Sequence, residues 1–237
     1  MNKAIIVGAT SGIGRELADI FVKNNYKVGI TGRRMQLLEE IKNENPDNYF
    51  IKCFDVTDTE TIYVNLNELV ADLGGLDMLI ILSAIVRKNE NLDFEIEKNI
   101  LNTNVLGFTC VADWGINFFE SQMFGHLVAI SSISGLRGNR YSTAYGASKA
   151  YQINYLEALR GRVSQLKYPI FVTDIRPGFV DTVMAGEIVF WLVSVKKAGS
   201  QIYKAIKKKK RVAYISKRWK FFAWALQILP VRIHQRI

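Results

Sequence analysis

Short apolar segments alternate with amphipathic ones along most of this chain, and this alternation constrains the fold more than any other feature. The first apolar segment, Lys3–Val7, passes through a glycine-rich turn into a predicted helix from about Ile13 to Asn24. Strands with continuous rather than alternating apolar residues are typical of parallel sheets covered by helices on both faces. The sequence therefore predicts an α/β fold built on a doubly wound parallel sheet.

The other elements follow from the same two patterns, and turn residues separate them. The predicted strands are Tyr26–Thr31, Asn48–Phe54, Asp77–Ser83, His126–Ser131 and Ile170–Ile175. The predicted helices are Met35–Asn45, Thr59–Leu73, Phe94–Phe119 and Tyr145–Leu166. Asp58 or Thr57 is expected to cap the helix that starts at Thr59.

The composition is that of one globular domain in a reducing, cytoplasmic setting. A chain of 237 residues with 49% hydrophobic residues can bury one sizeable core. Cys53 and Cys110 lie in apolar stretches, so we expect small buried side chains and no disulfide. His126 and His234 are far apart, which predicts no metal site. The sequence shows neither a signal peptide nor an apolar run long enough to cross a membrane.

Positive charge is concentrated in the last part of the chain. The whole chain has a net charge of +9, but residues 196–237 contain thirteen Lys and Arg and no Asp or Glu. Residues 1–195 therefore carry a net charge of −4. We expect two parts, a globular domain over 1–195 and a basic, aromatic-rich helical extension over 196–237.

The segment VGATSGIGRELA, which starts at Val7, places glycines at positions 8, 12 and 14 between a strand and a helix. Glycines permit positive φ angles, close approach of the backbone to a pyrophosphate, and close packing of the helix on the strand. The helix N-terminus adds free N–H groups and a partial positive charge. The spacing predicts a nucleotide cradle, and a purely structural turn is the alternative.

The end of the second predicted strand indicates which nucleotide is bound. A carboxylate usually stands there when the ribose carries a free 2′-hydroxyl, but this chain has Gly32 followed by Arg33 and Arg34. Arginines suit a 2′-phosphate, so we expect NADP rather than NAD; a solvated basic turn is the alternative. Asp55, at the end of the third strand, either accepts a hydrogen bond from the adenine amino group or serves as a turn residue.

Tyr145 and Lys149 lie four residues apart at the start of a predicted helix, so their side chains share one face. An ammonium group beside a phenol favours the phenolate, and we expect Lys149 to lower the pKa of Tyr145 from its ordinary value near ~10. Such a pair can exchange protons near neutral pH. Ser132, thirteen residues upstream at the end of a strand, is placed to hold a carbonyl oxygen beside the tyrosine. Alone, the pair would also fit an ordinary surface helix.

Taken together, these residues resemble the short-chain dehydrogenase/reductase family. The matching features, in chain order, are the glycine turn, Asp55, Asn104 in NTNVLG, Ser132, Tyr145, Lys149 and the segment RPGFVDT (Arg176–Thr182). The resemblance covers roughly residues 3–182 and extends more loosely to about 210. It implies a single-domain Rossmann fold of about seven strands. It also implies NAD(P)-dependent interconversion of a carbonyl and an alcohol.

The resemblance implies a role for each matched residue. Tyr145 is the general acid in reduction and the base in oxidation, while Lys149 lowers its pKa and holds the nicotinamide ribose. Ser132 orients the substrate oxygen, and Asn104 supports a water-linked proton relay. The expected cofactor-binding residues are Gly8, Thr10, Ser11, Gly12, Ile13, Gly14, Arg33, Arg34, Asp55, Val56, Ser83, Tyr145, Lys149, Pro177, Gly178, Val180 and Thr182.

The sequence departs from the family's pattern at two places around the cofactor. Val7 stands where the family has a threonine before the first glycine. The family's N-N-A-G after the fourth strand is replaced by ILSA, Ile81–Ala84, so the amide side chains that tie neighbouring strands are absent. We expect local repacking there, with Ser83 taking over part of the role.

Residues 183–195 occupy the position of the family's substrate loop and are rich in apolar side chains. Met184, Phe190 and Trp191 are expected to contact the substrate together with Ser132 and Tyr145. A lid over an apolar substrate is one interpretation. A segment packed into the core or into an oligomer contact is the other.

The basic extension places Trp219, Phe222, Ala223 and Leu226 at helical spacing among lysines and arginines. This combination suits the surface of an anionic membrane; contact with a partner subunit and a solvated basic face are the alternatives. No known nucleic-acid-binding motif accompanies the lysine run at 207–210. We therefore expect peripheral membrane association and no nucleic acid partner.

The sequence as a whole predicts an NADP-dependent reductase for a hydrophobic ketone or secondary alcohol. The alternative is a non-catalytic NADP-binding sensor or scaffold, in which the altered Ile81–Ala84 segment reflects relaxed catalytic demand. A homo-oligomer, either a dimer or a tetramer, is expected in addition.

Overall fold

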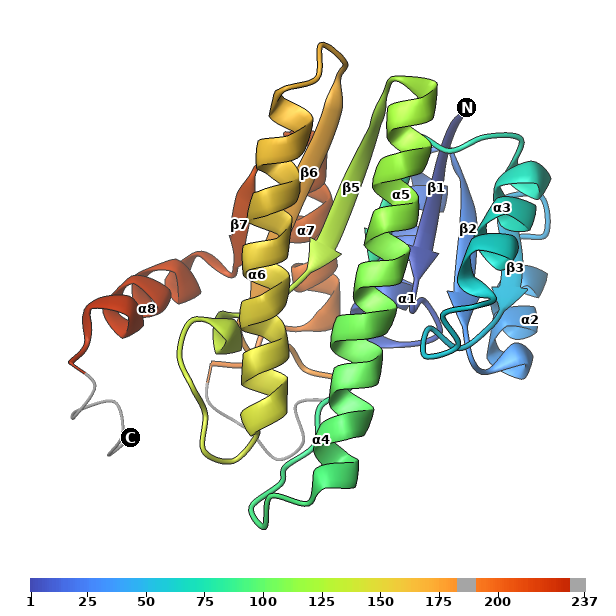
Figure 1. Ribbon diagram of the computed structural model, residues 1–237. Coiled ribbons are helices and arrows are strands. Elements are labelled where there is room, and N and C mark those ends of the chain that lie inside the picture. Colours follow the sequence, from blue (N-terminus) through green and yellow to red (C-terminus); the bar gives the residue numbers. More distant parts are fainter. Residues whose placement is uncertain (183–190, 231–237) are drawn as a thin grey trace.

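Seven parallel strands form one sheet in the order β3-β2-β1-β4-β5-β6-β7 (Figure 1), which confirms the predicted doubly wound Rossmann-type fold. The computed structural model describes residues 1–182 and 191–230. The strands are β1 Asn2–Val7, β2 Tyr26–Gly32, β3 Tyr49–Cys53, β4 Met78–Ile81, β5 Gly125–Ile130, β6 Ile170–Pro177 and β7 Val212–Ile215. Strand order reverses between β1 and β4, and ligands bind this fold at the carboxyl ends of the strands beside such a reversal.

Helices cover both faces of the sheet, and an apolar core lies on each side (Figure 1). Helices α1 (Gly12–Lys23), α2 (Met35–Glu44) and α7 (Val195–Lys207) pack on one face. Helices α3 (Ile62–Leu73), α5 (Phe108–Gln122) and α6 (Thr143–Ser164) pack on the other. The continuous apolar character of the strands follows from this burial on both faces. Helix α4 (Phe94–Leu101) lies against α6.

The helix expected over Phe94–Phe119 is present, but it is not α-helical throughout. A π-helical segment, Asn102–Gly107, separates α4 from α5, and α5 continues to Gln122. The chain passes very close to the Val56 backbone at Gly107. A Cβ atom at this position would lie 2.3 Å from the Val56 carbonyl oxygen, so the close approach requires glycine. Irregular turns of this kind recur at functional sites, and this one carries Asn104.

The sequence placed two smaller features incorrectly. Asp58 and Thr57 do not cap the third helix, which begins at Ile62 with Thr61 as its N-cap residue; Asp58 instead accepts a hydrogen bond from the Thr61 hydroxyl at 3.0 Å. Cys53, expected to be buried, is exposed at the end of the outermost strand β3.

The sheet continues into the basic segment that was expected to be a helical extension. That expectation is wrong for Val212–Ile215, because this stretch is β7, the seventh strand of the sheet. Helix α7 packs on α1, where a Cβ atom at Gly199 would lie 2.5 Å from Glu16. Among the described helices, α8 (Lys217–Ile228) alone stands beyond the sheet edge (Figure 1). In the part of the chain that the structure describes, no helix is long and apolar enough to cross a membrane.

Candidate active site

The glycine turn connects β1 to α1 and requires glycine at three places. Gly8 and Gly12 have φ angles of 92° and 56°, which favour glycine. A Cβ atom at Gly14 would lie 2.2 Å from the Gly8 carbonyl oxygen. Ser11 caps α1 in an extended conformation without a side-chain hydrogen bond to the helix. The first N–H groups of α1 are therefore arranged as in an anion-binding helix N-terminus.

The altered segment after β4 is held by backbone contacts and apolar packing. The carbonyl oxygen of Val7 accepts hydrogen bonds from the N–H groups of Leu82 at 2.9 Å and Ser83 at 3.0 Å. Ile81 is buried in the core, as is Val7 itself. The backbone thus ties β1 to the chain after β4 without the family's amide side chains, as the expected local repacking requires.

Ser83 provides a direct test of whether this turn fits a dinucleotide. Its hydroxyl oxygen is buried and has no hydrogen-bond partner among the described residues. A Cβ atom at Gly8 would lie 2.7 Å from the Ser83 backbone nitrogen, so the hydroxyl borders the glycine turn. Because a buried hydroxyl without a partner costs free energy, a polar ligand in the cradle would resolve the deficit. The residues present fit the cofactor.

The two arginines after β2 have different partners. Arg34 Nη2 donates to the hydroxyls of Thr10 at 2.6 Å and Ser11 at 3.2 Å, which places the guanidinium at the glycine turn. Arg33 pairs with the Asp55 carboxylate at 3.2 Å. Gly32, the last residue of β2, passes close to the glycine turn, since a Cβ atom there would lie 2.7 Å from the Thr10 methyl group.

Asp55 serves its own turn as well as Arg33. Its carboxylate accepts a hydrogen bond from the Thr57 N–H at 2.9 Å. Burial raises the pKa of Asp55, but the bonds from Thr57 and the ion pair with Arg33 outweigh it and hold the pKa below its ordinary value. The turn role, one of the two expected, is present; the adenine contact stays a prediction. Val56 is buried beside it.

Ser132, Tyr145 and Lys149 come together at the carboxyl end of β5. Ser132 follows the strand and accepts a hydrogen bond from the Ser134 N–H at 3.1 Å. Tyr145 lies in the first turn of α6, and the Lys149 ammonium is 5.8 Å from the centre of the tyrosine ring. Lys149 Nζ donates to the Ile130 carbonyl oxygen at 3.0 Å. Helix α6 thus presents an acid and a base beside a hydroxyl.

The electrostatics of this group differ from the expected pattern. Burial raises the pKa of Tyr145, and a hydrogen bond with Ser132 partly offsets the rise. Burial also lowers the pKa of Lys149 to about 7, opposed by the buried carboxylate of Asp174. The net shift of the Tyr145 pKa is thus opposite to the expected lowering, because burial outweighs the hydrogen bond with Ser132; the contribution of Lys149 itself stays a prediction. The ammonium lies over the ring, and its own charge is only partial near neutral pH.

Asn104 sits in the π-helical segment, where its side chain is fully engaged. Its Nδ2 donates to the Ile85 carbonyl oxygen at 2.9 Å and to Ser148 Oγ at 3.1 Å, while its Oδ1 accepts from the Ile85 N–H at 2.8 Å. Its carbonyl oxygen accepts a hydrogen bond from Gln152 Nε2 at 2.8 Å. Gln152 was not among the predicted site residues, although it follows Lys149 by one helical turn.

The segment after β6 brings further predicted residues to the same edge. The Gly178 N–H donates to the Ile215 carbonyl oxygen at 2.8 Å, directly after Pro177 ends β6. Val180 forms a bridge with Val193. A Cβ atom at Gly12 would lie 3.3 Å from the Thr182 methyl group, so Thr182 borders the glycine turn. The turn's remaining predicted residue, Ile13, packs against the core.

Of the predicted substrate residues, Met184 and Phe190 lie outside the described residues. Trp191 is 41% exposed. Its ring centre lies 5.6 Å from that of Trp219 in α8. Its carbonyl oxygen accepts a hydrogen bond from Arg218 at 2.8 Å. The end of the expected substrate loop is therefore fastened to α8.

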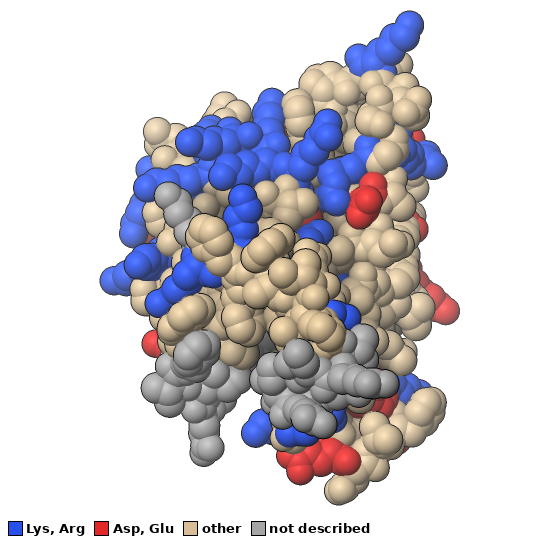
Figure 2. All heavy atoms as spheres, turned by 90° about the vertical axis from the view of Figure 1, so that its left-hand side faces the viewer, with Lys and Arg blue, Asp and Glu red and all other residues tan. Residues whose placement is uncertain are grey.

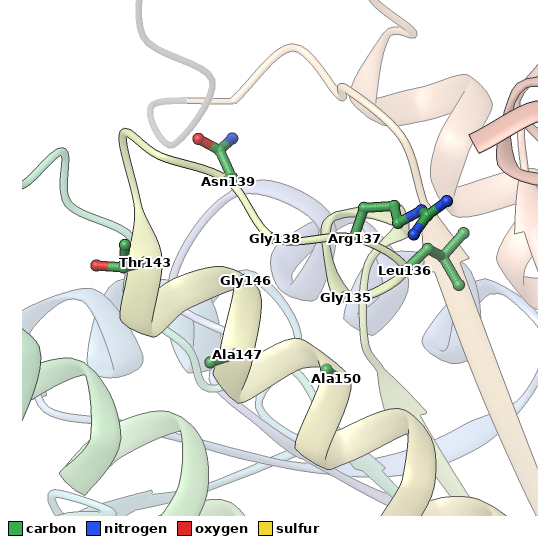
Figure 3. Close-up of a pocket in the computed structure, with 9 residues that line it drawn as sticks. All are labelled: Gly135, Leu136, Arg137, Gly138, Asn139, Thr143, Gly146, Ala147 and Ala150. Atoms are coloured by element: carbon green, nitrogen blue, oxygen red, sulfur yellow. The ribbon is translucent and has the colours of Figure 1, made fainter. Parts of the chain in front are cut away.

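A hollow of about 410 Å³ lies between the first turns of α6 and the segment before it, and Figure 3 shows the residues that line it. Its lining residues are Gly135, Leu136, Arg137, Gly138, Asn139, Thr143, Gly146, Ala147 and Ala150. On α6 these residues flank Tyr145 and Lys149 without including either, so the hollow is distinct from the catalytic group. Over residues 1–182 and 191–230, no three His, Cys, Asp or Glu side chains form a group that could hold a metal ion.

Comparison with known proteins places these features in a family. A family model described as short chain dehydrogenase matches residues 2–192. An uncharacterized oxidoreductase of Myxococcus xanthus (strain DK1622) is 31% identical over 182 residues, which are 75% of this chain and 71% of that protein. Another, from Staphylococcus aureus (strain USA300), is 29% identical over 182 residues and covers 76% of this chain and 78% of its own.

Two solved structures share the fold. ElxO with NADP bound has a TM-score of 0.81 and 24% identity, over 90% of this chain and 96% of that chain. Serine dehydrogenase from Escherichia coli has a TM-score of 0.78 and 23% identity, also over 90% of this chain and 96% of its own. At this level of identity the two structures support the architecture.

Proposed function

Because the chain belongs to the short-chain dehydrogenase family and is an oxidoreductase, we propose that it interconverts a hydrophobic ketone and its secondary alcohol with NADP(H). The observation that carries this proposal is the grouping of Ser132, Tyr145 and Lys149 at the sheet edge that also holds the glycine turn. A phenol, a hydroxyl and a lysine beside a dinucleotide cradle suit proton exchange with a carbonyl oxygen.

The residues of the chain divide the work of such a reaction. The cofactor, when bound in the cradle, supplies or accepts the hydride. Ser132 donates a hydrogen bond to the substrate oxygen and fixes its position. Tyr145 delivers a proton to that oxygen in reduction and removes it in oxidation. Lys149, at 5.8 Å from the tyrosine ring centre, favours the phenolate when it is charged and holds the nicotinamide ribose.

The preference for NADP is supported by Arg34. Its guanidinium bonds to hydroxyls of the glycine turn, and no carboxylate of the described residues forms an ion pair with it. A guanidinium in that position suits a 2′-phosphate. The similar structure of ElxO, with NADP bound, adds support.

A hydrophobic substrate is supported by the side chains that follow β6. Trp191 is partly exposed next to the catalytic edge, and Phe179 packs on Trp219 with ring centres 5.4 Å apart. Such apolar, aromatic surroundings favour an apolar ligand. The free thiols of Cys53 and Cys110 support the cytoplasmic location that we also propose. The homo-oligomer stays a prediction.

The decisive experiment measures NADPH oxidation with a panel of hydrophobic ketones and diketones, beside Tyr145→Phe. We expect turnover with at least one carbonyl and its loss in the variant, with NADPH binding retained. Tight NADPH binding without turnover of any carbonyl would favour the alternative, a non-catalytic NADP sensor.

A further inference from the structure

Helix α8 has one buried face and one exposed apolar face. Trp219 and Ala223 are each 1% exposed and pack on Ile133, directly after Ser132. The sequence assigned both to a membrane-facing surface, and this assignment is wrong because they hold the helix to the domain. The most exposed large apolar residues are Phe221, Trp224 and Ile228, at 75%, 63% and 61% exposure, whereas Phe222 is 37% exposed.

These three exposed residues lie on one stripe of the helix, because their spacing of three and four residues matches the helical repeat. The helix that carries them is fixed at both ends. Arg137 donates to the carbonyl oxygens of Leu226, Gln227 and Leu229 at its C-terminal end. Arg218 donates to the carbonyl oxygens of Trp191 and Leu192 at its start.

Basic residues lie beside the exposed stripe on α8 and before the neighbouring edge strand β7. Arg218 and Lys220 are exposed on α8 itself. The exposed run 207–211 comes just before β7, the edge strand that α8 follows. On this side of the molecule Figure 2 shows blue atoms gathered above an area of tan. From residue 196 onward the sequence has no acidic residue. A second copy of the chain would bring the same positive charge against itself, so the surface suits an anionic partner.

We propose that α8 docks the protein on an anionic lipid bilayer, with Phe221, Trp224 and Ile228 in the interface and the basic residues over the headgroups. Aromatic and aliphatic side chains beside cationic ones are the features of helices that lie in such an interface. Because the buried face of α8 packs beside Ser132 and on the segment after β6, docking would bring the catalytic edge close to the lipid.

The test is co-sedimentation of the full chain with vesicles of phosphatidylcholine alone and of phosphatidylcholine mixed with phosphatidylserine. We expect binding to the mixed vesicles only, weakened by high salt. Phe221→Ser combined with Trp224→Ser should weaken this binding by about tenfold or more, and Lys208→Gln combined with Lys210→Gln by about fivefold or more.

Phe94→Ser combined with Val64→Ser is the matched control, because both side chains are also exposed, at 70% and 58%, and lie on other helices. It should bind like the unchanged chain. Vesicle binding that survives the α8 substitutions, or absence of vesicle binding at low salt, would overturn the proposal. Self-association or nucleic-acid binding that the same substitutions weaken equally would also overturn it. NADPH binding in the same samples shows that each variant is folded and tests the proposed function separately.

A second inference rests on Gln152, a buried residue of α6 that is 1% exposed. Its Oε1 accepts a hydrogen bond from Lys149 Nζ at 2.8 Å, and its Nε2 donates to the Asn104 carbonyl oxygen at 2.8 Å. The side chain thus links the lysine directly to the π-helical segment, in the place where a water-linked relay was expected. Both the oxygen and the nitrogen of the carboxamide form hydrogen bonds. The oxygen must face Lys149, because an ammonium group can only donate.

We propose that Gln152 is a positioning residue that holds the Lys149 side chain beside Tyr145. The Lys149 ammonium donates to two neutral acceptors, the Ile130 carbonyl oxygen and Gln152 Oε1. The inference rests on the proposed function only for its catalytic consequence. The protonation state of Lys149 can be measured without any enzymatic turnover.

The test is the titration of Lys149 by NMR in the full chain labelled with ¹³C at the lysine Cε, with Lys149→Arg to assign the signal. Gln152→Glu places a carboxylate at the ammonium and should raise the pKa of Lys149 by about one unit or more. Gln152→Met removes the acceptor and should lower it. Opposite shifts are not expected from a residue that only fills space.

Gln122→Met is the matched control, because the Gln122 side chain also makes two hydrogen bonds, from its Nε2 to the carbonyl oxygens of Leu76 and Phe124, far from Lys149. It should leave the Lys149 titration unchanged. Shifts in the same direction for both Gln152 variants, or shifts in neither, would overturn the proposal. Each variant is informative alone, so failure of one to fold leaves the other as the test.

Discussion

The two arginines after β2 should contribute unequally to the choice of cofactor. Arg34 bonds to the Thr10 and Ser11 hydroxyls, whereas Arg33 is paired with the Asp55 carboxylate at 3.2 Å. A 2′-phosphate would meet the full charge of Arg34 and a partly compensated charge at Arg33. We therefore expect Arg34→Ala to lose more NADPH affinity than Arg33→Ala.

The size of the effect follows from the exposure of these side chains. A hydrogen bond to a charged group contributes about 1.5–3 kcal/mol when it is well shielded. Both arginines are exposed, so solvent and salt reduce the gain toward roughly 1.5 kcal/mol. Arg34→Ala should then raise the Kd for NADPH about tenfold and change the Kd for NADH little. Arg33→Ala should raise the Kd for NADPH by about threefold or less.

Calorimetric titration of both cofactors measures this without knowledge of the substrate. Arg15→Ala is the control, because Arg15 also lies near the glycine turn but pairs with Asp19 and Glu44; it should leave the ratio of the two Kd values unchanged. Equal losses for NADPH and NADH in Arg34→Ala would refute the reasoning, and so would a larger effect of Arg33→Ala.

Three further predictions concern other parts of the structure. Gly14→Ala should abolish NADPH binding in calorimetry, because a Cβ atom there would lie 2.2 Å from a carbonyl oxygen of the turn. Gly178→Ala should cost about 1–3 kcal/mol in urea unfolding by pressing on Trp219, whereas Gly138→Ala, which has nothing within 4 Å, should stay within about 0.5 kcal/mol. Burial lowers the pKa of His126 to about 4, so on acidification the unfolded chain binds a proton at this histidine before the folded chain does. The free energy of unfolding should therefore fall by about 3 kcal/mol as the pH drops from about 6.5 to 4. His126→Gln should flatten this pH dependence in urea unfolding.

The main sheet could be predicted because its central strands are buried on both faces. Continuous apolar runs such as Ile5–Val7 and Leu79–Ile81, bounded by turn residues, favour strands of a covered parallel sheet. Strand β7 could not be found in the same way, because Val212–Ile215 follows a run of lysines and only its alternate residues are fully buried. Its place depends on pairing with β6, a long-range contact that local sequence does not encode.

In the site, residue types were predictable and contacts were not. The Tyr145–Lys149 spacing placed both side chains on one face of α6, as the helical repeat requires. The direction of the pKa change did not follow from spacing, because it depends on how deeply the fold buries both groups. Gln152 carries the same helical periodicity as Lys149, but its role depends on the π-helical turn that brings the Asn104 carbonyl to it.

For α8, the periodicity of the apolar residues does not predict which face of the helix is buried. Apolar residues occupy nearly all sides of Lys217–Ile228, so the sequence supports more than one apolar stripe. The stripe with Trp219 and Ala223 is buried because Gly178 leaves room for the indole, with a Cβ position only 2.3 Å from the ring. That fit leaves Phe221, Trp224 and Ile228 outside. The glycine of the segment after β6 therefore determines which face of α8 a membrane can meet, which couples the shape of the catalytic edge to the proposed docking surface.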